Sequence, residues 1–188
     1  MKRVFLCMAM LMISIAISSQ NRVAYALKAD PYPMLRGVEV FNYRIDFSKL
    51  KIEGMDAKDY IIGFVYDEED NKDVAFNRFS NKVENKFIAY VNRELKGKYK
   101  LDNSSDSRFE IVVSFLIADE DGGHKMTGEI IDKENKQTIA EIKSSAGGGR
   151  LNKFDALFIE ELEKSTEKFC DRLRDNVLSI ANHKRYKK

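Results

Sequence analysis

Hydrophobic and polar residues alternate along several stretches of the chain. In residues 38–47, the odd-numbered positions from Phe41 to Phe47 are large and apolar, and the even-numbered positions between them are polar. Because successive side chains of a β-strand point to opposite faces, this pattern predicts a strand with one buried face. Similar reasoning predicts three further strands, over residues 109–117, 124–131 and 137–143.

Two of these predicted strands have additional features. In residues 109–117 the even-numbered positions Val112 and Leu116 are apolar as well, which predicts a strand at the centre of its sheet. Gly128 interrupts the pattern of residues 124–131 and predicts either a β-bulge or a close approach of another segment. We treat residues 49–55 and 101–108 as connections.

Two longer stretches have apolar residues at every third or fourth position, the spacing of one face of an α-helix. The first lies between Asp73 and Leu95 and ends before Gly97, a residue suited to helix termination. Its apolar stripe is Ala75, Phe79, Val83, Phe87, Val91 and Leu95. The second follows the glycine-rich residues 144–149 and extends toward Ile180. Its stripe is Leu151, Phe154, Phe158, Leu162, Phe169, Leu173 and Val177.

Residues 56–66 permit two interpretations. Asp56 suits the N-cap of a short helix, whereas residues 60–66 are rich in strand-forming residues. We favour a short helical turn that becomes extended.

The first 26 residues have the order of a secretory signal peptide. Two basic residues precede an apolar run, Val4 to Ile17, and Ala24 and Ala26 supply the small side chains that a signal peptidase accepts. The run is shorter than the roughly 20 residues that span a bilayer, and we expect no transmembrane span elsewhere. We therefore predict export of the mature chain after cleavage following Ala26, with cleavage after Ser19 as the alternative.

The remaining residues, about 160, suit one domain with its own core. We expect an extended leader over residues 27–36, a single domain over residues 37–180 and a polar basic tail over residues 181–188. The order of elements places the domain in the α+β class, with a mainly antiparallel four- to five-stranded sheet and two long helices packed on one face.

Removal of the signal peptide changes the charge of the protein. The whole chain has 32 basic and 30 acidic residues, and three of the basic residues lie in residues 1–26, which have no acidic residue. The mature chain is therefore slightly acidic, which argues against nucleic-acid binding. Cys7 leaves with the signal, so Cys170 has no internal disulfide partner, and its helical surroundings predict a small buried hydrophobic residue.

Few residues have the spacing that catalysis or metal binding requires. His124 and His183 are the only histidines, and neither lies near a nucleophile or a cluster of metal ligands in the sequence. We therefore predict no catalytic residue, no metal ion and no cofactor.

One loop is a candidate for ligand contact. Gly147, Gly148, Gly149 and Arg150 precede the second helix, where helix N-termini attract anions and Arg150 would add a positive charge. The glycine spacing of known phosphate loops is absent, so a flexible connection is the alternative interpretation.

Three short segments resemble those of a known group of proteins. They are Ile52-Glu53-Gly54-Met55, Ile130-Ile131-Asp132 and Gly147-Gly148-Gly149-Arg150-Leu151-Asn152. Together they resemble small exported proteins of Gram-negative bacteria that have no assigned function. The order of elements is also similar, more distantly, to that of periplasmic activators of peptidoglycan synthases. The resemblance implies a periplasmic or secreted α+β protein and no catalytic residues. The chain departs from the activators because it has no cysteine placed for lipid attachment.

These observations favour an exported, non-enzymatic accessory or protein-interaction module of the cell envelope, with an envelope protein as its partner and no nucleic acid. The alternative is an envelope hydrolase or a small-molecule binding protein. Such a protein would use the Gly147–Arg150 loop, and the hydrolase would add carboxylates from residues 119–121. The sequence does not define the oligomeric state.

Overall fold

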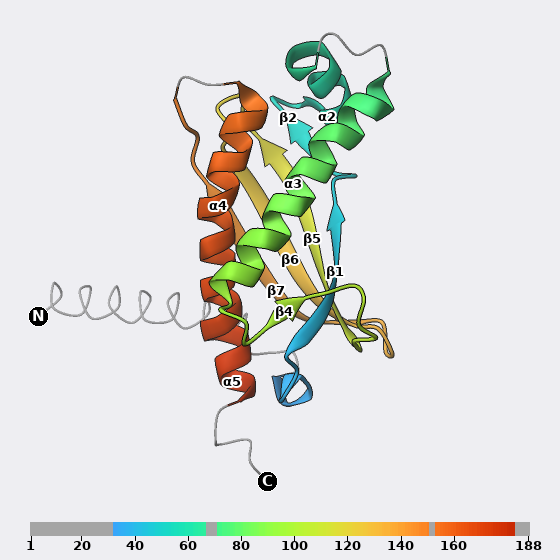
Figure 1. Ribbon diagram of the computed structural model, residues 1–188, viewed down its shortest axis with the longest axis vertical. Helices are drawn as coiled ribbons and strands as arrows, with labels where there is room; N and C mark the ends of the chain where they lie inside the picture. Colours follow the sequence, from blue (N-terminus) through green and yellow to red (C-terminus); the bar gives the residue numbers. More distant parts are fainter. Residues whose placement is uncertain (1–31, 67–70, 151–152, 183–188) are drawn as a thin grey trace, which may run out of the picture.

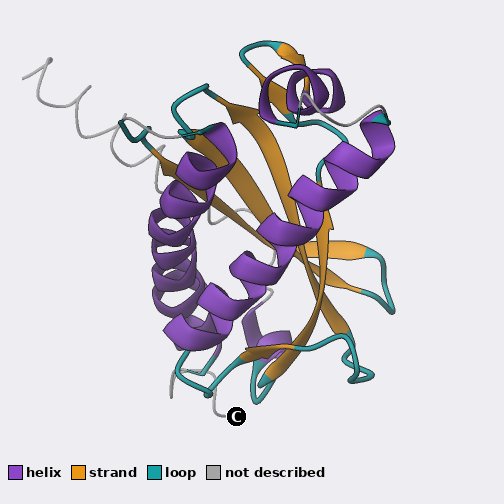
Figure 2. Ribbon diagram, turned by 45° about the horizontal axis from the view of Figure 1, so that its top comes forward, coloured by secondary structure: helices purple, strands orange, loops and turns teal. Residues whose placement is uncertain are grey.

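A mixed β-sheet with two long helices on one face forms the body of the protein (Figure 1). The computed structural model describes residues 32–66, 71–150 and 153–182. The two helices, α3 (Lys72–Glu94) and α4 (Phe154–Arg172), cross each other over the same face of the sheet, as Figure 2 shows from a second direction. The predicted signal peptide lies outside the described residues.

The sheet is organised around β5 (Phe109–Ala118), which has neighbours on both sides, as predicted for a central strand. β6 (His124–Asp132) and β7 (Gln137–Ala146) continue the sheet on one side in antiparallel order. On the other side, β1 (Val40–Asp46) pairs with the first half of β5, and β2 (Lys51–Ile52) pairs with its last two residues. β4 (Lys100–Leu101) adjoins the start of β1, and β3 (Met55–Asp56) pairs with β2.

The antiparallel pairing predicted for most of the sheet holds for β2 with β3 and for β5 to β7, but the sheet is mixed and has more strands than predicted, because β1 is parallel to β4 and β5, and β2 is parallel to β5. The cause is the crossover through α3, whose 23 residues carry the chain about 35 Å back along the sheet. β5 therefore starts at the same end as β1, and adjacent strands joined in this way are parallel. The residues treated as connections contain the short strand β2 and one residue each of the equally short strands β3 and β4.

Shorter helical segments accompany the two long helices. Asp56 caps α2 (Ala57–Tyr60), since its carboxylate accepts a hydrogen bond from the Lys58 backbone N–H at 3.0 Å. This confirms the helical turn, but the predicted extension after it is wrong, because residues 61–65 form the π-helical segment η2 (Ile61–Val65). The π-helical segment η3 (Leu173–Leu178) and the short helix α5 (Ser179–Ala181) continue α4.

The two ends of the predicted domain also differ from expectation. Residues 27–36 were expected to be extended, but their described part contains the 3₁₀-helix η1 (Tyr32–Leu35), in which Leu35 is fully buried. Ala181, assigned by the sequence to a polar tail, is fully buried as well. The packed domain therefore extends beyond the predicted range of residues 37–180 at both ends, to include Leu35 and Ala181.

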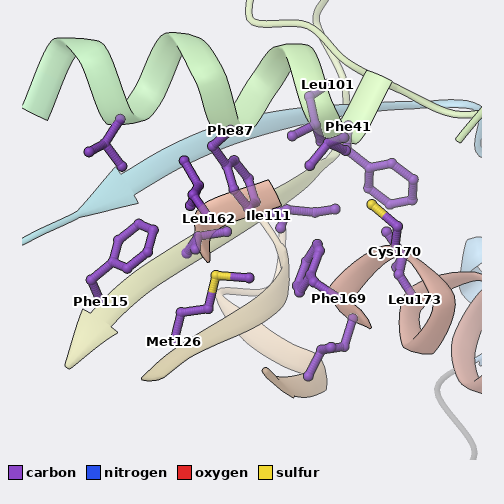
Figure 3. Close-up of a cluster of buried hydrophobic side chains, with 14 of the residues drawn as sticks. Phe41, Phe87, Leu101, Ile111, Phe115, Met126, Leu162, Phe169, Cys170 and Leu173 are labelled. Atoms are coloured by element: carbon purple, nitrogen blue, oxygen red, sulfur yellow. The ribbon is translucent and has the colours of Figure 1, made fainter. Parts of the chain in front are cut away.

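The main core lies between the helices and the sheet. The predicted stripe of α3 is buried along its whole length, with Phe79 and Phe87 fully enclosed. In Figure 3, Phe87 lies near Ile111 of β5 and Phe169 of α4. Rings of this size contribute roughly 1.5–3 kcal/mol each on burial, so the core stabilises both helices against the sheet. Among the described residues, no helix has the length and apolar character needed to cross a membrane.

Candidate functional site

The outer edge of β1 has a neighbouring strand over only its first two residues. β4 pairs with Val40 and Phe41, whereas β5 accompanies β1 on its inner side from Asn42 to Asp46. Beyond Phe41, no strand of the described chain adjoins the outer side. Unpaired N–H and C=O groups at such an edge are able to accept another extended segment.

The side chain of Asn103 takes the place of a neighbouring strand at Tyr43. Its Oδ1 atom accepts a hydrogen bond from the Tyr43 backbone N–H at 2.8 Å, and its Nδ2 atom donates to the Tyr43 carbonyl oxygen at 3.0 Å. The peptide groups of an adjacent strand would offer the same acceptor and donor. At Tyr43, the hydrogen-bonding groups of the β1 edge are therefore satisfied by one side-chain amide.

A hollow of about 560 Å³ opens beside this edge. The β1 segment from Asn42 to Ile45 lines it, together with Glu84 of α3 and Ser105 of the loop after β4. Glu110 of β5 and Lys133, which follows β6, complete the polar lining. The hollow therefore offers hydrogen-bonding and charged groups rather than an apolar surface.

Asn42 fixes the loop that forms one wall of the hollow. Its side chain is 8% exposed and donates to the carbonyl oxygens of Asp102 and Ser105, both at 2.9 Å. Its Oδ1 atom accepts a hydrogen bond from the Lys133 ammonium at 2.8 Å. Because both ends of this buried amide have partners, Asn42 holds the loop and the lysine in defined positions.

The charges around the hollow are divided between the two faces of the sheet. Arg44 lies on the face without long helices and pairs with Glu110 at 3.8 Å, and Lys133 reaches the same face through Asn42. Glu84 lies on the helix-covered side, near Tyr43. Burial raises the pKa of the Tyr43 hydroxyl above its ordinary value, and the charges of Glu84 and Asp102 raise it further. The phenol is therefore a neutral hydrogen-bonding group at physiological pH.

The sequence-predicted loop Gly147–Arg150 lies at the opposite end of β5 from the hollow, against the turn between β5 and β6. The Gly149 backbone N–H donates to the Asp121 carbonyl oxygen at 2.8 Å. A Cβ atom on Gly148 would lie 1.7 Å from Asp121 Cγ, and one on Gly149 would lie 2.7 Å from Leu157 Cδ2. Close packing therefore accounts for these two glycines. Arg150 is exposed.

The carboxylates considered for a hydrolase form part of the same turn. Asp121 Oδ1 accepts a hydrogen bond from the Gly123 backbone N–H at 3.0 Å, and the Glu120 backbone N–H donates to Glu53 Oε1 at 2.8 Å. Within the described residues, no three histidine, cysteine or acidic side chains are grouped closely enough to hold a metal ion.

Sequence analysis missed a buried polar pair between β6 and α4. His124 Nε2 lies 2.8 Å from Ser165 Oγ, and His124 Nδ1 lies 2.9 Å from the Gly122 carbonyl oxygen. Because a carbonyl oxygen only accepts, we assign the proton of the neutral ring to Nδ1, which leaves Nε2 to accept from the serine. The signal for this pair was Ser165 itself, a polar residue within the apolar stripe of its helix.

The His124–Ser165 pair has the hydroxyl–imidazole chemistry of some hydrolases, but its surroundings are those of a packing contact. His124 is 3% exposed and Ser165 is fully buried. The imidazole stacks on the ring of Phe158, with centroids 4.5 Å apart. Burial lowers the pKa of His124, although the Gly122 carbonyl and the charge of Glu161 oppose this effect. A substrate would have no route to the serine without displacing core side chains.

No family model matches the chain, and no curated protein is similar to it. Among solved structures, it is similar to a point variant of the PelC dodecamer from Paraburkholderia phytofirmans, with 11% identity and a TM-score of 0.39, over 71% of this chain and 87% of that one. The same dodecamer in another crystal form gives 11% identity and a TM-score of 0.39, over 70% and 89%. The chain is also similar to a candidate lipoprotein from Caulobacter crescentus CB15, with 7% identity and a TM-score of 0.35, over 53% of this chain and 83% of that one.

Proposed function

We propose that this protein is an exported, non-enzymatic accessory module of the Gram-negative cell envelope that binds a partner protein at the free edge of β1. The observation that carries the proposal is the pair of hydrogen bonds between the Asn103 side chain and the Tyr43 backbone. They support an edge that accepts peptide-like partners, and the hollow beside Asn103 leaves room for one.

The polar groups of the hollow suit binding better than chemistry. Asn42 is fully hydrogen-bonded and Arg44 is paired with Glu110, so neither is arranged to accept or release a proton during a reaction. Fixed amides and charges recognise a partner by hydrogen bonding and electrostatic complementarity. Residues 1–26 support delivery of the protein to the envelope, where a partner protein would meet it.

The direct test places a photo-crosslinking amino acid at the rim of the hollow in the full-length protein, expressed in its own cells. Asp106 is suited to this substitution because its side chain is fully exposed and lies 4.0 Å from Lys133. Glu141 on β7, at the other edge of the sheet, is the matched control position. We expect one envelope protein to be crosslinked from position 106 and not from position 141.

Variants of the hollow decide whether the crosslink reports binding at this site. Asn103→Asp keeps the acceptor for the Tyr43 N–H but loses the donor to its carbonyl oxygen, so we expect a weaker crosslink from position 106. An unchanged crosslink in this variant, or equal crosslinking from both positions, would show that the partner does not use the β1 edge.

The alternative function is small-molecule binding at the Gly147–Arg150 loop. In its favour, Arg150 is exposed and a Cβ atom on Gly147 would meet no atom within 4 Å. Calorimetry with inorganic phosphate, comparing the wild-type protein with Arg150→Ala, tests this function separately. Binding that is lost in the variant would support the loop as a ligand site.

A further inference from the structure

We propose that His124 takes up a second proton while the protein stays folded, and that the Ser165 hydroxyl changes its hydrogen-bond acceptor as it does so. The ring and the hydroxyl then form a proton-sensitive switch inside the core, between β6 and α4. His124 pairs with Ala118 at the end of β5, whereas the hollow lies at the start of that strand. The switch therefore neither requires nor excludes a partner at the β1 edge.

In the neutral state, both ring nitrogens of His124 have a partner. Nδ1 carries the proton and donates to the Gly122 carbonyl oxygen at 2.9 Å, and Nε2 accepts a hydrogen bond from the Ser165 hydroxyl at 2.8 Å. A second proton would bind at Nε2 and turn this atom from an acceptor into a donor. The charged ring therefore fits only if Ser165 accepts from Nε2 instead of donating to it.

The position of Ser165 allows this exchange. Its Oγ atom also lies 3.1 Å from the Leu162 carbonyl oxygen, three residues earlier in α4. Rotation about the Cβ–Oγ bond moves the hydroxyl proton from Nε2 to this carbonyl, which leaves a lone pair of Oγ to accept from the charged ring. Because each state has a complete set of partners, neither leaves the buried imidazole or the buried hydroxyl unsatisfied.

A buried carboxylate on the same face of α4 offers a compensating charge. Glu161 precedes Ser165 by four residues, and its side chain is 2% exposed. Burial lowers the pKa of His124, and the Gly122 carbonyl and the negative charge of Glu161 oppose this effect. Lys164 donates to Glu161 Oε1 at 2.5 Å, but 56% of its side chain is exposed. Since solvent screens an exposed charge more than a buried one, the carboxylate has the larger influence on the ring.

The other elements around the ring add mainly apolar neighbours. Phe158 of α4 stacks on the imidazole, and the centroid of the Phe115 ring of β5 lies 5.6 Å from that of His124. On β7, the cross-strand neighbour is Ala146. The turn before β6 adds the carboxylate of Asp121, which is hydrogen-bonded within its own turn. The charges to consider around the ring are therefore the two carboxylates, one from this turn and one from α4, and the ammonium bound to the second.

The ring is linked to the surface through the same turn. The Gly122 carbonyl oxygen accepts from Nδ1, and the neighbouring Asp121 carbonyl oxygen accepts from the Gly149 N–H at 2.8 Å. A charged donor makes a shorter and stronger hydrogen bond than a neutral one. Proton uptake should therefore tighten the turn and alter its contact with the glycine loop, so that the state of His124 is detectable at Gly149.

The switch is tested by NMR of the mature protein with isotope-labelled histidine, in a His183→Gln background that leaves a single imidazole signal. At pH 8 we expect a neutral ring with its proton on Nδ1. Nε2 should become protonated below pH 6.5, the ordinary pKa of histidine, while circular dichroism still shows the folded protein. The Gly149 amide should shift along the same titration, whereas the Ile45 amide, beside the hollow, should not.

Two pairs of matched variants separate the switch from burial alone. Ser165→Ala removes the acceptor of the charged Nε2–H, so the proton should bind at least tenfold more weakly and the titration midpoint should fall by at least one pH unit. Ser144→Ala is its control, because this buried hydroxyl donates to the Ser165 carbonyl oxygen at 2.6 Å and not to the ring. Glu161→Gln should lower the midpoint as well, whereas Glu160→Gln, at an exposed position of α4, should not.

Three results would overturn the switch. They are a His124 ring that stays neutral until the folded signals disappear, a neutral ring with its proton on Nε2, and a Ser165→Ala protein that titrates at the same pH as the wild-type protein. If Ser165→Ala does not fold, Ser165→Cys takes its place. Its thiol accepts hydrogen bonds more weakly, so its midpoint should fall in the same direction.

Discussion

The ring of Phe169 lies so close to the backbone of Gly128 that residue 128 has no room for a side chain of its own. An ideal Cβ atom on Gly128 would be 2.4 Å from Phe169 Cε2, well inside contact distance. The glycine therefore leaves a gap in β6 that the α4 ring fills. The sequence predicted either a bulge or a close approach at Gly128, and the close approach is what occurs. The irregularities of the sheet lie elsewhere, between Phe115 and Ile117 and between Ile130 and Ile131.

Gly128→Ala should lower the free energy of unfolding by about 1–3 kcal/mol, because the added methyl group overpacks a rigid, buried ring. Urea denaturation measures the change. Gly63→Ala is the control, since a Cβ atom there would meet nothing within 4 Å. Combining Gly128→Ala with Phe169→Leu should recover part of the loss, and a double-mutant cycle isolates the coupling. If Gly128→Ala costs no more than the control, the close contact is not a constraint.

Three glycines near the turn between β5 and β6 should respond in a graded way to alanine. Gly147→Ala enters open space and should have little effect. Gly148→Ala displaces the Asp121 carboxylate from the Gly123 N–H and should cost about 1 kcal/mol, the value of one hydrogen bond. Gly122→Ala should cost about 3 kcal/mol, because its φ is +83° and its Cβ atom would lie 2.5 Å from the Leu157 backbone carbon of α4.

Thermal and urea unfolding of the three variants measure their loss of stability, which should increase from Gly147→Ala through Gly148→Ala to Gly122→Ala. If Gly148→Ala is as stable as the wild-type protein yet loses phosphate binding, the loop serves a ligand rather than packing.

The stability of the protein should depend on pH through His124. Burial holds the pKa of the folded imidazole below its ordinary value of 6.5, so the unfolded chain binds a proton that the folded chain does not. This contribution is complete above about pH 6.5 and is lost progressively as the pH falls below that value. Free energies of unfolding between pH 8 and pH 5 should therefore decline more steeply for the wild-type protein than for His124→Phe. Parallel pH dependences of the two proteins would contradict this assignment.

Cys170 should be inert in the folded protein. Burial, aided by the charges of Glu94 and Asp171, raises the pKa of its thiol to about 12, so the reactive thiolate is scarce at neutral pH. In a Cys7→Ser chain, iodoacetamide at pH 8 should modify Cys170 only after denaturation, as measured by intact mass. Rapid modification of the native protein would show that the thiol is accessible.

Local periodicity was sufficient to predict the two helices that cover the sheet. In α3, the spacing from Ala75 to Val91 defines one face of a helix, and these residues are buried because any amphipathic helix must cover its apolar face. The alternation in β1 likewise predicted which side of the strand faces the core. The direction of β1 relative to β5 was not predictable in this way. Periodicity indicates which face of a strand is buried, but it does not indicate which strand lies beside it or in which direction that strand runs.

The candidate site depends on contacts between distant parts of the chain. Asn103 and Tyr43 are 60 positions apart, and Lys133 and Asn42 are 91 positions apart. In the sequence, Asn103 is one polar residue in a polar loop, indistinguishable from residues that only contact solvent. Sequence by itself determined which faces of the elements are apolar, because that property follows from residue order and solvation. Only the folded chain decided that this amide meets a strand edge, because hydrogen bonds between residues so far apart form only when the crossover through α3 brings them together.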